Sequence, residues 1–275
     1  MLFSVIIPTA NRNELLTKCL DCLKQSIELF NEDEVEVIVT DDGKNNEAKE
    51  FIAKNYIWVK WVGGPKKGPA ANRNNGAKHA KGEWLIFLDD DCEPTETWII
   101  SFEKHINSYS ILEGKTIADR ERKTLAEESP INISGGQLWS CNFAIKKTLF
   151  NEIGGFDENF PYASMEDVDF RIRIEKRKIN YLFVQDAVVI HPWRKIVNTK
   201  RFKFYFKSLQ YFLTKYPEQK EQHNIPLYLY IICKKFFTET CMAVLKLDFN
   251  GAYYSLMNNL IDFYYSFKIL SWKAN

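Results

Sequence analysis

Short apolar runs alternate with segments of helical periodicity along the first 90 residues. Apolar runs at 5–7, 35–39 and 84–88, interrupted only by Glu36, have the length of strands that are buried on both faces. Between them, residues 14–29 carry apolar side chains at helical spacing, and residues 70–80 form a second helical segment. The order strand, helix, strand, helix, strand predicts an α/β domain with a largely parallel sheet flanked by helices.

The remainder of the chain is less regular. Residues 105–135 are polar, rich in charge and weakly periodic, which favours a surface connection. A helix is expected over 165–177 and a strand over 181–190. From residue 196 onward the pattern is helical and aromatic, and its breaks at Pro217, Pro226 and Asn250-Gly251 leave about three helices.

Charge and aromatic content divide the chain at the same place. The formal net charge of +1 provides no overall field for nucleic acid or for an anionic substrate. Residues 1–195 nevertheless carry 26 basic and 31 acidic side chains, whereas residues 196–275 carry 11 and 5. The last 80 residues also hold 19 of the 40 aromatic side chains. We therefore expect an α/β domain over 1–195 and a helical, aromatic and basic extension over 196–275.

The cysteines and the apolar runs indicate a cellular location. Six cysteines in 275 residues do not form a disulfide framework, and Cys19 and Cys22 lie in the apolar stripe of a helix, where core packing is favoured over metal binding. The N-terminus lacks the basic start of a secretory signal. The longest later apolar run, 225–233, is about half the roughly 20 residues that a membrane span needs. These features predict a cytoplasmic protein with reduced cysteines.

Polar side chains follow each predicted strand, at the sheet edge where ligands bind in parallel α/β folds. The three carboxylates of Asp89, Asp90 and Asp91 repel one another, so a cation is expected near them. Strand alternation places Asp89 and Asp91 on one side, and two oxygen ligands with open positions suit Mn²⁺ or Mg²⁺. His191, which follows a later strand, is a candidate ligand of the same ion. The alternatives are aspartates that cap the next helix and a structural histidine.

Five stretches occur in a fixed order over residues 3–194: VIIPTANR, VIVTDDG, GPAANRNNGAKHAKGEWLIFLDDDCEP, CNFAIKK, and GGFDENF followed by ASMEDVDFRIR. Together they resemble the motif set of the family 2 nucleotide-sugar glycosyltransferases of the GT-A fold. The resemblance implies a Rossmann-like, mostly parallel sheet flanked by helices, with residues 196–275 as an extension outside the family pattern.

The resemblance also implies a nucleotide-sugar donor and a metal. Thr9 and Asp41 would hold a uracil or thymine base, because an aspartate accepts a hydrogen bond from a pyrimidine N3–H. Mn²⁺ or Mg²⁺ bound by Asp89, Asp91 and His191 would neutralise the departing diphosphate. Further donor-binding positions are Asn11, Arg12, Arg73, Asp89 and Asp90.

Three features depart from the family pattern. Ala10 stands where many members carry an aromatic residue that stacks on the base, and Lys44, expected at the surface, stands where serine is usual. The C-terminal part lacks a QxxRW-type motif, which counts against a processive polymer synthase.

The catalytic base is expected in MEDVDFRIR. The resemblance assigns Asp167 as the general base that deprotonates the acceptor hydroxyl, and Glu166 as a group that orients the acceptor. The local alternative is a capping-box-like helix start at Ser164, with acidic side chains at a helix N-terminus. Asp169 is expected to cap or to pair with an arginine. Asn142 and Trp139 are candidates for the donor-sugar site, although a core tryptophan is equally compatible with the sequence.

The sequence therefore predicts a metal-dependent, inverting glycosyltransferase. It would transfer a sugar from a UDP- or dTDP-linked donor to a glycan or a lipid-linked saccharide, in surface polysaccharide biosynthesis. Residues 196–275 suit a peripheral contact with the inner face of the membrane, with packing on the first domain or on a second subunit of a homo-oligomer as the alternative. Nucleic-acid binding is not expected, because the basic residues are dispersed. The competing classes are a nucleotidyltransferase and a non-catalytic sugar-nucleotide or glycan-binding module.

Overall fold

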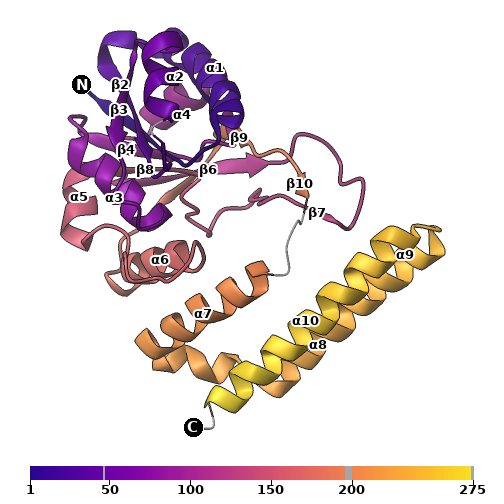
Figure 1. Ribbon diagram of the computed structural model, residues 1–275. Coiled ribbons are helices and arrows are strands. Elements are labelled where there is room, and N and C mark those ends of the chain that lie inside the picture. Colours follow the sequence, from indigo (N-terminus) through magenta and orange to yellow (C-terminus); the bar gives the residue numbers. More distant parts are fainter. Residues whose placement is uncertain (46, 196–199, 274–275) are drawn as a thin grey trace. The chain divides into compact units, whose positions relative to one another are not determined.

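The computed structural model describes residues 1–45, 47–195 and 200–273 (Figure 1). Contacts divide the chain into two compact units. The first unit comprises Met1–Asp119, Pro130–Asn159 and Glu166–Pro192. The second unit comprises Arg120–Ser129, Phe160–Met165 and Trp193–Asn275. The helical C-terminal part thus forms one unit with two segments from earlier in the chain, which the predicted boundary at residue 195 does not include.

The first unit is built on an eight-stranded sheet with the order β3-β2-β1-β4-β8-β6-β9-β5. Parallel pairing joins β1 to both β2 and β4, β2 to β3, and β6 to β9; β8 lies antiparallel between β4 and β6. The predicted strands at 5–7, 35–39, 84–88 and 181–190 are confirmed. The strands are β1 (Phe3–Thr9), β2 (Val35–Asp41), β3 (Val59–Gly63), β4 (Trp84–Leu88), β5 (Glu93–Pro94), β6 (Ile111–Ile117), β8 (Asn142–Lys146) and β9 (Leu182–Ile190).

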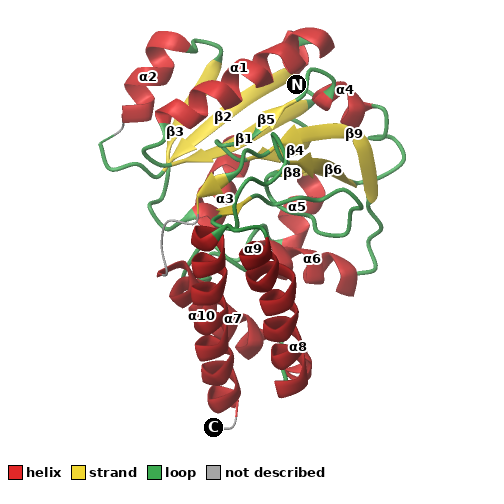
Figure 2. Ribbon diagram, turned by 90° about the vertical axis from the view of Figure 1, so that its right-hand side faces the viewer, coloured by secondary structure: helices red, strands yellow, loops and turns green. Residues whose placement is uncertain are grey.

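Helices cover both faces of this sheet (Figure 2). One core lies beneath α1 (Asn13–Phe30), α2 (Glu47–Asn55) and α4 (Trp98–Glu103), where Leu16 and Trp98 pack on strand residues such as Val5. The other core lies beneath α3 (Pro69–His79), α5 (Lys147–Ile153) and α6 (Glu166–Lys176), where Phe170 packs with Ile6 and other strand residues. A short 3₁₀ turn, η1 (Glu32–Glu34), precedes β2. The predicted mixed α/β fold is confirmed.

The prediction of residues 105–135 as a surface connection is wrong for 111–117, which form the buried strand β6. Glu113 and Lys115 interrupt the apolar pattern of this strand, so the sequence did not indicate it. Glu113 is fully buried, and its carboxylate accepts hydrogen bonds from the Asn132 side chain at 2.8 Å and from the backbone N–H groups of Gly136, Gln137 and Leu138 at 2.6–2.8 Å. A buried carboxylate with four donors is compatible with the core and fixes the loop that returns to the sheet.

The second unit is mainly helical. The two-residue strands β7 (Glu127–Glu128) and β10 (Arg194–Lys195) pair antiparallel, and α8 packs beside α10 (Figure 1). The helix breaks predicted at Pro217, Pro226 and Asn250 fall at helix starts. The helices are α7 (Lys200–Lys215), η2 (Pro217–Gln222), α8 (Ile225–Lys235), η3 (Phe236–Cys241), α9 (Met242–Leu245) and α10 (Phe249–Lys273). Within the described residues, no helix combines the length and the apolar character that crossing a membrane requires.

Replacing Glu113 by glutamine is expected to destabilise the first unit. The glutamine amide would direct an N–H group at backbone N–H donors, so we expect the free energy of unfolding to fall by about 3 kcal/mol. Glu96 is exposed, and Glu96→Gln should change that free energy by less than about 0.5 kcal/mol. Urea denaturation of both variants measures the difference. Equal stability of the two variants would contradict the assigned role of Glu113.

Candidate active site

The carboxyl ends of β1, β2 and β4 bring together polar residues from three separate parts of the sequence. Thr9 and Asp41 are register partners at the ends of β1 and β2, and both are buried. The Asp41 carboxylate accepts hydrogen bonds from the Gly43 backbone N–H at 2.7 Å and from Trp61 Nε1 at 3.3 Å. The predicted base-binding residues therefore lie side by side, with Asp41 held in place by its own neighbours.

The three consecutive aspartates lie in a turn. Strand β4 ends at Leu88, and the Cys92 backbone N–H donates to the Asp89 carbonyl at 3.1 Å. Strand alternation therefore does not apply to Asp89, Asp90 and Asp91, and each carboxylate has its own partners. Asp89 pairs with an arginine of α3, Asp90 with Thr9 at the end of β1, and Asp91 with a histidine that follows β9.

Arg73 lies at the centre of an acidic cluster. Its side chain is only 6% exposed; Nη2 donates to Asp89 Oδ1 at 2.5 Å, and Nη1 lies 3.6 Å from Glu166 Oε1. Burial opposes the charge of Arg73, but the carboxylates of Asp89, Asp167 and Glu166 outweigh it and raise the pKa of the guanidinium. Arg73 is therefore a permanent cation that holds Asp89 next to the start of α6.

Two neighbouring asparagines position Arg73. Asn72 accepts a hydrogen bond from the Thr40 hydroxyl at 2.5 Å and donates to the Thr40 carbonyl at 2.8 Å, which attaches α3 to the end of β2. Asn74 exchanges hydrogen bonds with the backbone of Phe156 at 2.8 and 2.9 Å. These positioning residues were missed in the sequence, although three asparagines around an arginine are unfavourable in a helix and indicate specific side-chain contacts.

The carboxylates around Arg73 have unequal proton affinities. Burial would raise the pKa of Asp89, but the Arg73 guanidinium outweighs it and lowers that pKa. Burial, together with the charge of Asp167, raises the pKa of Glu166 to about 7. Burial also raises the pKa of Asp167, against the opposing effect of Arg73. Asp89 is thus a fixed anion, whereas Glu166 and Asp167 at the start of α6 take up protons more readily.

Several buried polar atoms in this cluster have no hydrogen-bond partner within the described part of the chain. They are Arg73 Nε and Nη1, Glu166 Oε2 and Asp167 Oδ1. Unsatisfied buried polar atoms are rare in folded proteins and are costly, so a group of them makes this cluster a candidate ligand site. The backbone just before α6 is also strained, since Met165 has a φ of 73°.

The contacts of Asp90 connect two strands of the sheet. It is fully buried, accepts a hydrogen bond from the Thr9 hydroxyl at 2.6 Å and lies 2.5 Å from Arg12 Nη2. Burial raises its pKa to about 7, although Arg12 and Thr9 favour the charged form. The two strands β1 and β4 are therefore linked at their carboxyl ends. Asn11, with a φ of 55°, accepts a hydrogen bond from the Lys44 backbone N–H at 3.3 Å and orders the same edge.

Asp91 and His191 provide a candidate metal centre. His191 Nε2 lies 3.4 Å from Asp91 Oδ1, and these two side chains and the Cys92 thiol have ligand atoms within 4.8 Å of one another. Burial, and to a lesser extent a hydrogen bond with Cys141, raises the pKa of the Cys92 thiol. Cys92 belongs to the core beneath α1. A carboxylate oxygen and an imidazole nitrogen remain as ligands, and this pair fits Mn²⁺ or Mg²⁺.

Three other residues that the sequence singled out, Asn142, Trp139 and Asp169, make contacts that stabilise the fold. The Asn142 amide accepts from Trp98 Nε1 at 2.8 Å and donates to the carbonyls of Lys115 and Ala187, so it joins strands inside the sheet. Trp139 packs against the core beneath α1. Asp169 pairs with Arg173 at 2.9 Å, as expected for a residue that stabilises α6.

Comparison with known proteins identifies the family. The model of the family described as "Glycosyl transferase family 2" matches residues 4–153, which is more than half of the chain. Glycosyltransferase AglE of Haloferax volcanii is 25% identical over 208 residues, which cover 70% of this chain and 67% of AglE. The GalNAc(5)-diNAcBac-PP-undecaprenol beta-1,3-glucosyltransferase of Campylobacter jejuni is 36% identical over 104 residues, which cover 33% of this chain and 29% of that enzyme.

The similar proteins are longer than the matched part of this chain. A chondroitin synthase of Pasteurella multocida is 24% identical over 237 residues, and the match covers 68% of this chain but only 24% of the synthase. Among solved structures, S. aureus TarS in complex with UDP-GlcNAc superimposes with a TM-score of 0.58 at 21% identity, covering 76% of this chain and 64% of TarS. This likeness confirms the GT-A-type fold, and the family match shows that the chain belongs to glycosyl transferase family 2.

Proposed function

We propose that this protein is a metal-dependent, inverting glycosyltransferase that moves a sugar from a UDP- or dTDP-linked donor to a saccharide acceptor. The observation that carries this proposal is the cluster around Arg73. It unites Asp89 of the aspartate turn with Glu166 and Asp167 of α6, although these residues are far apart in the sequence. Such an arrangement suits a reaction in which a diphosphate leaves on one side of a sugar and a carboxylate activates an acceptor on the other.

The donor would bind across the carboxyl ends of the first strands. Support comes from the adjacency of Thr9 and Asp41, from the nearby cations Arg12 and Arg73, and from the UDP-GlcNAc complex of the structurally similar TarS. Mn²⁺ or Mg²⁺ held by Asp91 and His191 would supply positive charge to the departing diphosphate. Asp89, which the sequence grouped with these ligands, is paired with Arg73, and its predicted contact with metal stays a prediction.

Asp167 would take the proton from the acceptor hydroxyl. Its unpartnered Oδ1 atom and its raised pKa both suit a group that must accept a proton. Glu166 Oε2 is also unpartnered and would accept a hydrogen bond from another acceptor hydroxyl. The Arg73 guanidinium lies 3.6 Å from the other oxygen of Glu166, Oε1, and attracts Asp167 through its charge.

The acceptor would be a lipid-linked saccharide presented at the cytoplasmic face of a membrane, in the assembly of a surface polysaccharide. Support comes from the second unit, where large apolar side chains are exposed along α8 and α10 and basic residues outnumber acidic ones. Exposed apolar side chains among lysines suit binding to the surface of an anionic bilayer.

All six cysteines are free thiols, which agrees with a reducing compartment.

Loss of the Asp91 carboxylate is expected to weaken metal-dependent donor binding. In the presence of Mn²⁺, Asp91→Ala should reduce the affinity for UDP at least about tenfold, because one of two metal ligands is removed. Asp186 is an exposed residue of β9, and Asp186→Ala should bind UDP like the parent protein. Isothermal titration calorimetry measures both affinities. Equal affinities for the Asp91 variant and the parent would exclude Asp91 as a metal ligand.

Neutralising Asp167 is expected to stop transfer while leaving donor binding intact. Asp167→Asn should lower kcat by about 100-fold or more, since general-base catalysis contributes at least that much, and should change UDP affinity less than about threefold. In the parent, kcat/KM should rise with pH through the raised pKa of Asp167, because only the charged carboxylate accepts a proton.

Glu175, exposed on the same helix, provides the matched control, and Glu175→Gln should keep both the rate and the pH profile of the parent. Donor turnover with saccharide acceptors, followed by release of the nucleoside diphosphate, gives the rates. If Asp167→Asn keeps the parental rate, or if its kcat/KM still rises with pH as in the parent, another group acts as the base.

A further inference from the structure

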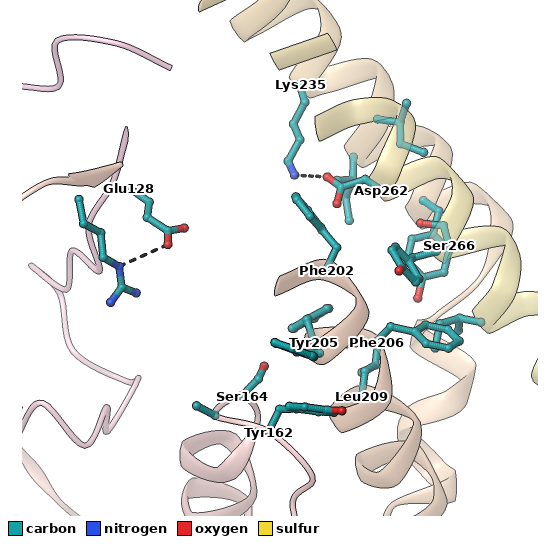
Figure 3. A pocket seen from close by; sticks show the side chains of 18 residues that line it. Glu128, Tyr162, Ser164, Phe202, Tyr205, Phe206, Leu209, Lys235, Asp262 and Ser266 are labelled. Atoms are coloured by element: carbon teal, nitrogen blue, oxygen red, sulfur yellow. Dashed lines mark hydrogen bonds and ion pairs between the residues drawn. The ribbon is translucent and has the colours of Figure 1, made fainter. Parts of the chain in front are cut away.

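The second unit contains a cavity of about 720 Å³ that is formed entirely by its own residues (Figure 3). Aromatic side chains from the segment 160–165 and from α7 lie around it, among them Tyr162, Phe202, Tyr205 and Phe206. Residues of α8 and α10 complete the lining. The volume lies within the range of roughly 300–1,000 Å³ that is usual for sites that bind small organic ligands.

The lining favours a hydrocarbon chain over a sugar. Four of its 18 residues are charged, and these form two ion pairs, Glu128 with Arg194 at 3.3 Å and Lys235 with Asp262 at 2.5 Å (Figure 3). Two are serines and four are tyrosines, and the remaining eight have side chains without polar atoms. A saccharide needs several polar partners when it is buried, whereas an apolar chain gains free energy from contact with such walls.

The order of residues in the chain connects this cavity to the proposed base. Tyr162, Ala163 and Ser164 line the cavity, and Asp167 follows Ser164 after three residues. Three residues of polypeptide span at most about 11 Å, whatever conformation they adopt. Ser164, a lining residue of the cavity, is therefore close to Asp167 along the chain.

The helices that line the cavity also carry apolar side chains that are exposed to solvent. Leu229 and Tyr230 of α8 are 50% and 61% exposed, while Tyr228, Ile231 and Ile232 of the same helix line the cavity. On α10, Phe263 and Phe267 are 53% and 65% exposed. The helices α8 and α10 therefore present apolar side chains both to the cavity and to solvent, and the solvent-facing ones suit contact with a membrane surface.

We propose that this cavity binds the hydrocarbon chain of a lipid-linked acceptor, so that the second unit selects the lipid part of the substrate while the first unit performs transfer. This inference rests on the proposed function for the identity of the acceptor. The lining of the cavity by itself supports a single hydrocarbon chain as the ligand.

The test measures binding of farnesyl phosphate, a short and water-soluble isoprenoid phosphate, to the full chain by calorimetry. We expect binding of farnesyl phosphate and none of inorganic phosphate. Ile232→Trp and Ser266→Phe fill the cavity from two different helices and should each lower the affinity at least about tenfold. In both variants UDP should bind with Mn²⁺ as in the parent, which shows that the first unit remains folded.

Phe263→Ser on the outer face of α10 is the matched control. It should leave binding of farnesyl phosphate unchanged but reduce co-sedimentation with vesicles that contain phosphatidylglycerol, whereas the cavity variants should retain vesicle binding. Parental affinity for farnesyl phosphate in both cavity variants would overturn the proposal. Equal competition by dihexanoyl phosphatidylglycerol would overturn the acceptor assignment and indicate a site for membrane phospholipid.

The outcome is separable from that of the proposed function. If the parent binds farnesyl phosphate in the cavity but Asp167→Asn retains parental transfer, the cavity assignment stands and the base assignment fails. If Asp167→Asn abolishes transfer to soluble saccharides and cavity filling has no effect on binding of farnesyl phosphate, the base assignment stands and the cavity assignment fails.

Discussion

The charge balance around Arg73 is the constraint on which the site depends. Its guanidinium is nearly inaccessible to water and faces carboxylates from the aspartate turn and from the start of α6. Without this cation, several buried carboxylates would lie close together with no compensating charge, at a cost of several kcal/mol. The amide contacts of Asn72 and Asn74 fix the helix that carries Arg73, so the arrangement of α3 on the sheet determines where the acidic groups meet.

This arrangement separates functions among residues that look equivalent in the sequence. Of the three consecutive aspartates, Asp90 links β1 to β4, Asp89 is a fixed anion beside Arg73, and Asp91 faces His191. Burial gives Glu166 and Asp167 raised pKa values, and each retains an unpartnered oxygen. Two carboxylates with a raised pKa and an unpartnered oxygen therefore lie at the start of α6, while Asp89, the anion that Arg73 holds, lies at the end of β4. A transfer reaction requires this division between proton acceptance and electrostatic stabilisation.

Part of the first unit could be predicted from the sequence, because the interior strands β1, β2 and β4 are short apolar runs and α1 has clear helical periodicity. The strand β6 could not be predicted, since Glu113 and Lys115 interrupt its apolar pattern and the donors that satisfy Glu113 come from residues 132–138. The pairing of Asp89 with Arg73 was also beyond the sequence, because the aspartates leave the strand conformation at Leu88. The association of 120–129 and 160–165 with the C-terminal helices depends on contacts between distant segments, which periodicity does not report.

The central claim is that the edge formed by β1, β2 and β4 is a metal-dependent site for a uracil or thymine nucleotide. The most direct measurement is calorimetric titration of the unmodified protein with UDP, dTDP, GDP and CMP, each with and without Mn²⁺. The account predicts that UDP or dTDP binds at least about tenfold more tightly with Mn²⁺ than without it, because the ion offsets the charge of the diphosphate. Both should also bind more tightly than GDP or CMP, because only uracil and thymine present a pyrimidine N3–H to Asp41. Absence of binding to every nucleotide, or affinities that do not depend on Mn²⁺, would contradict it.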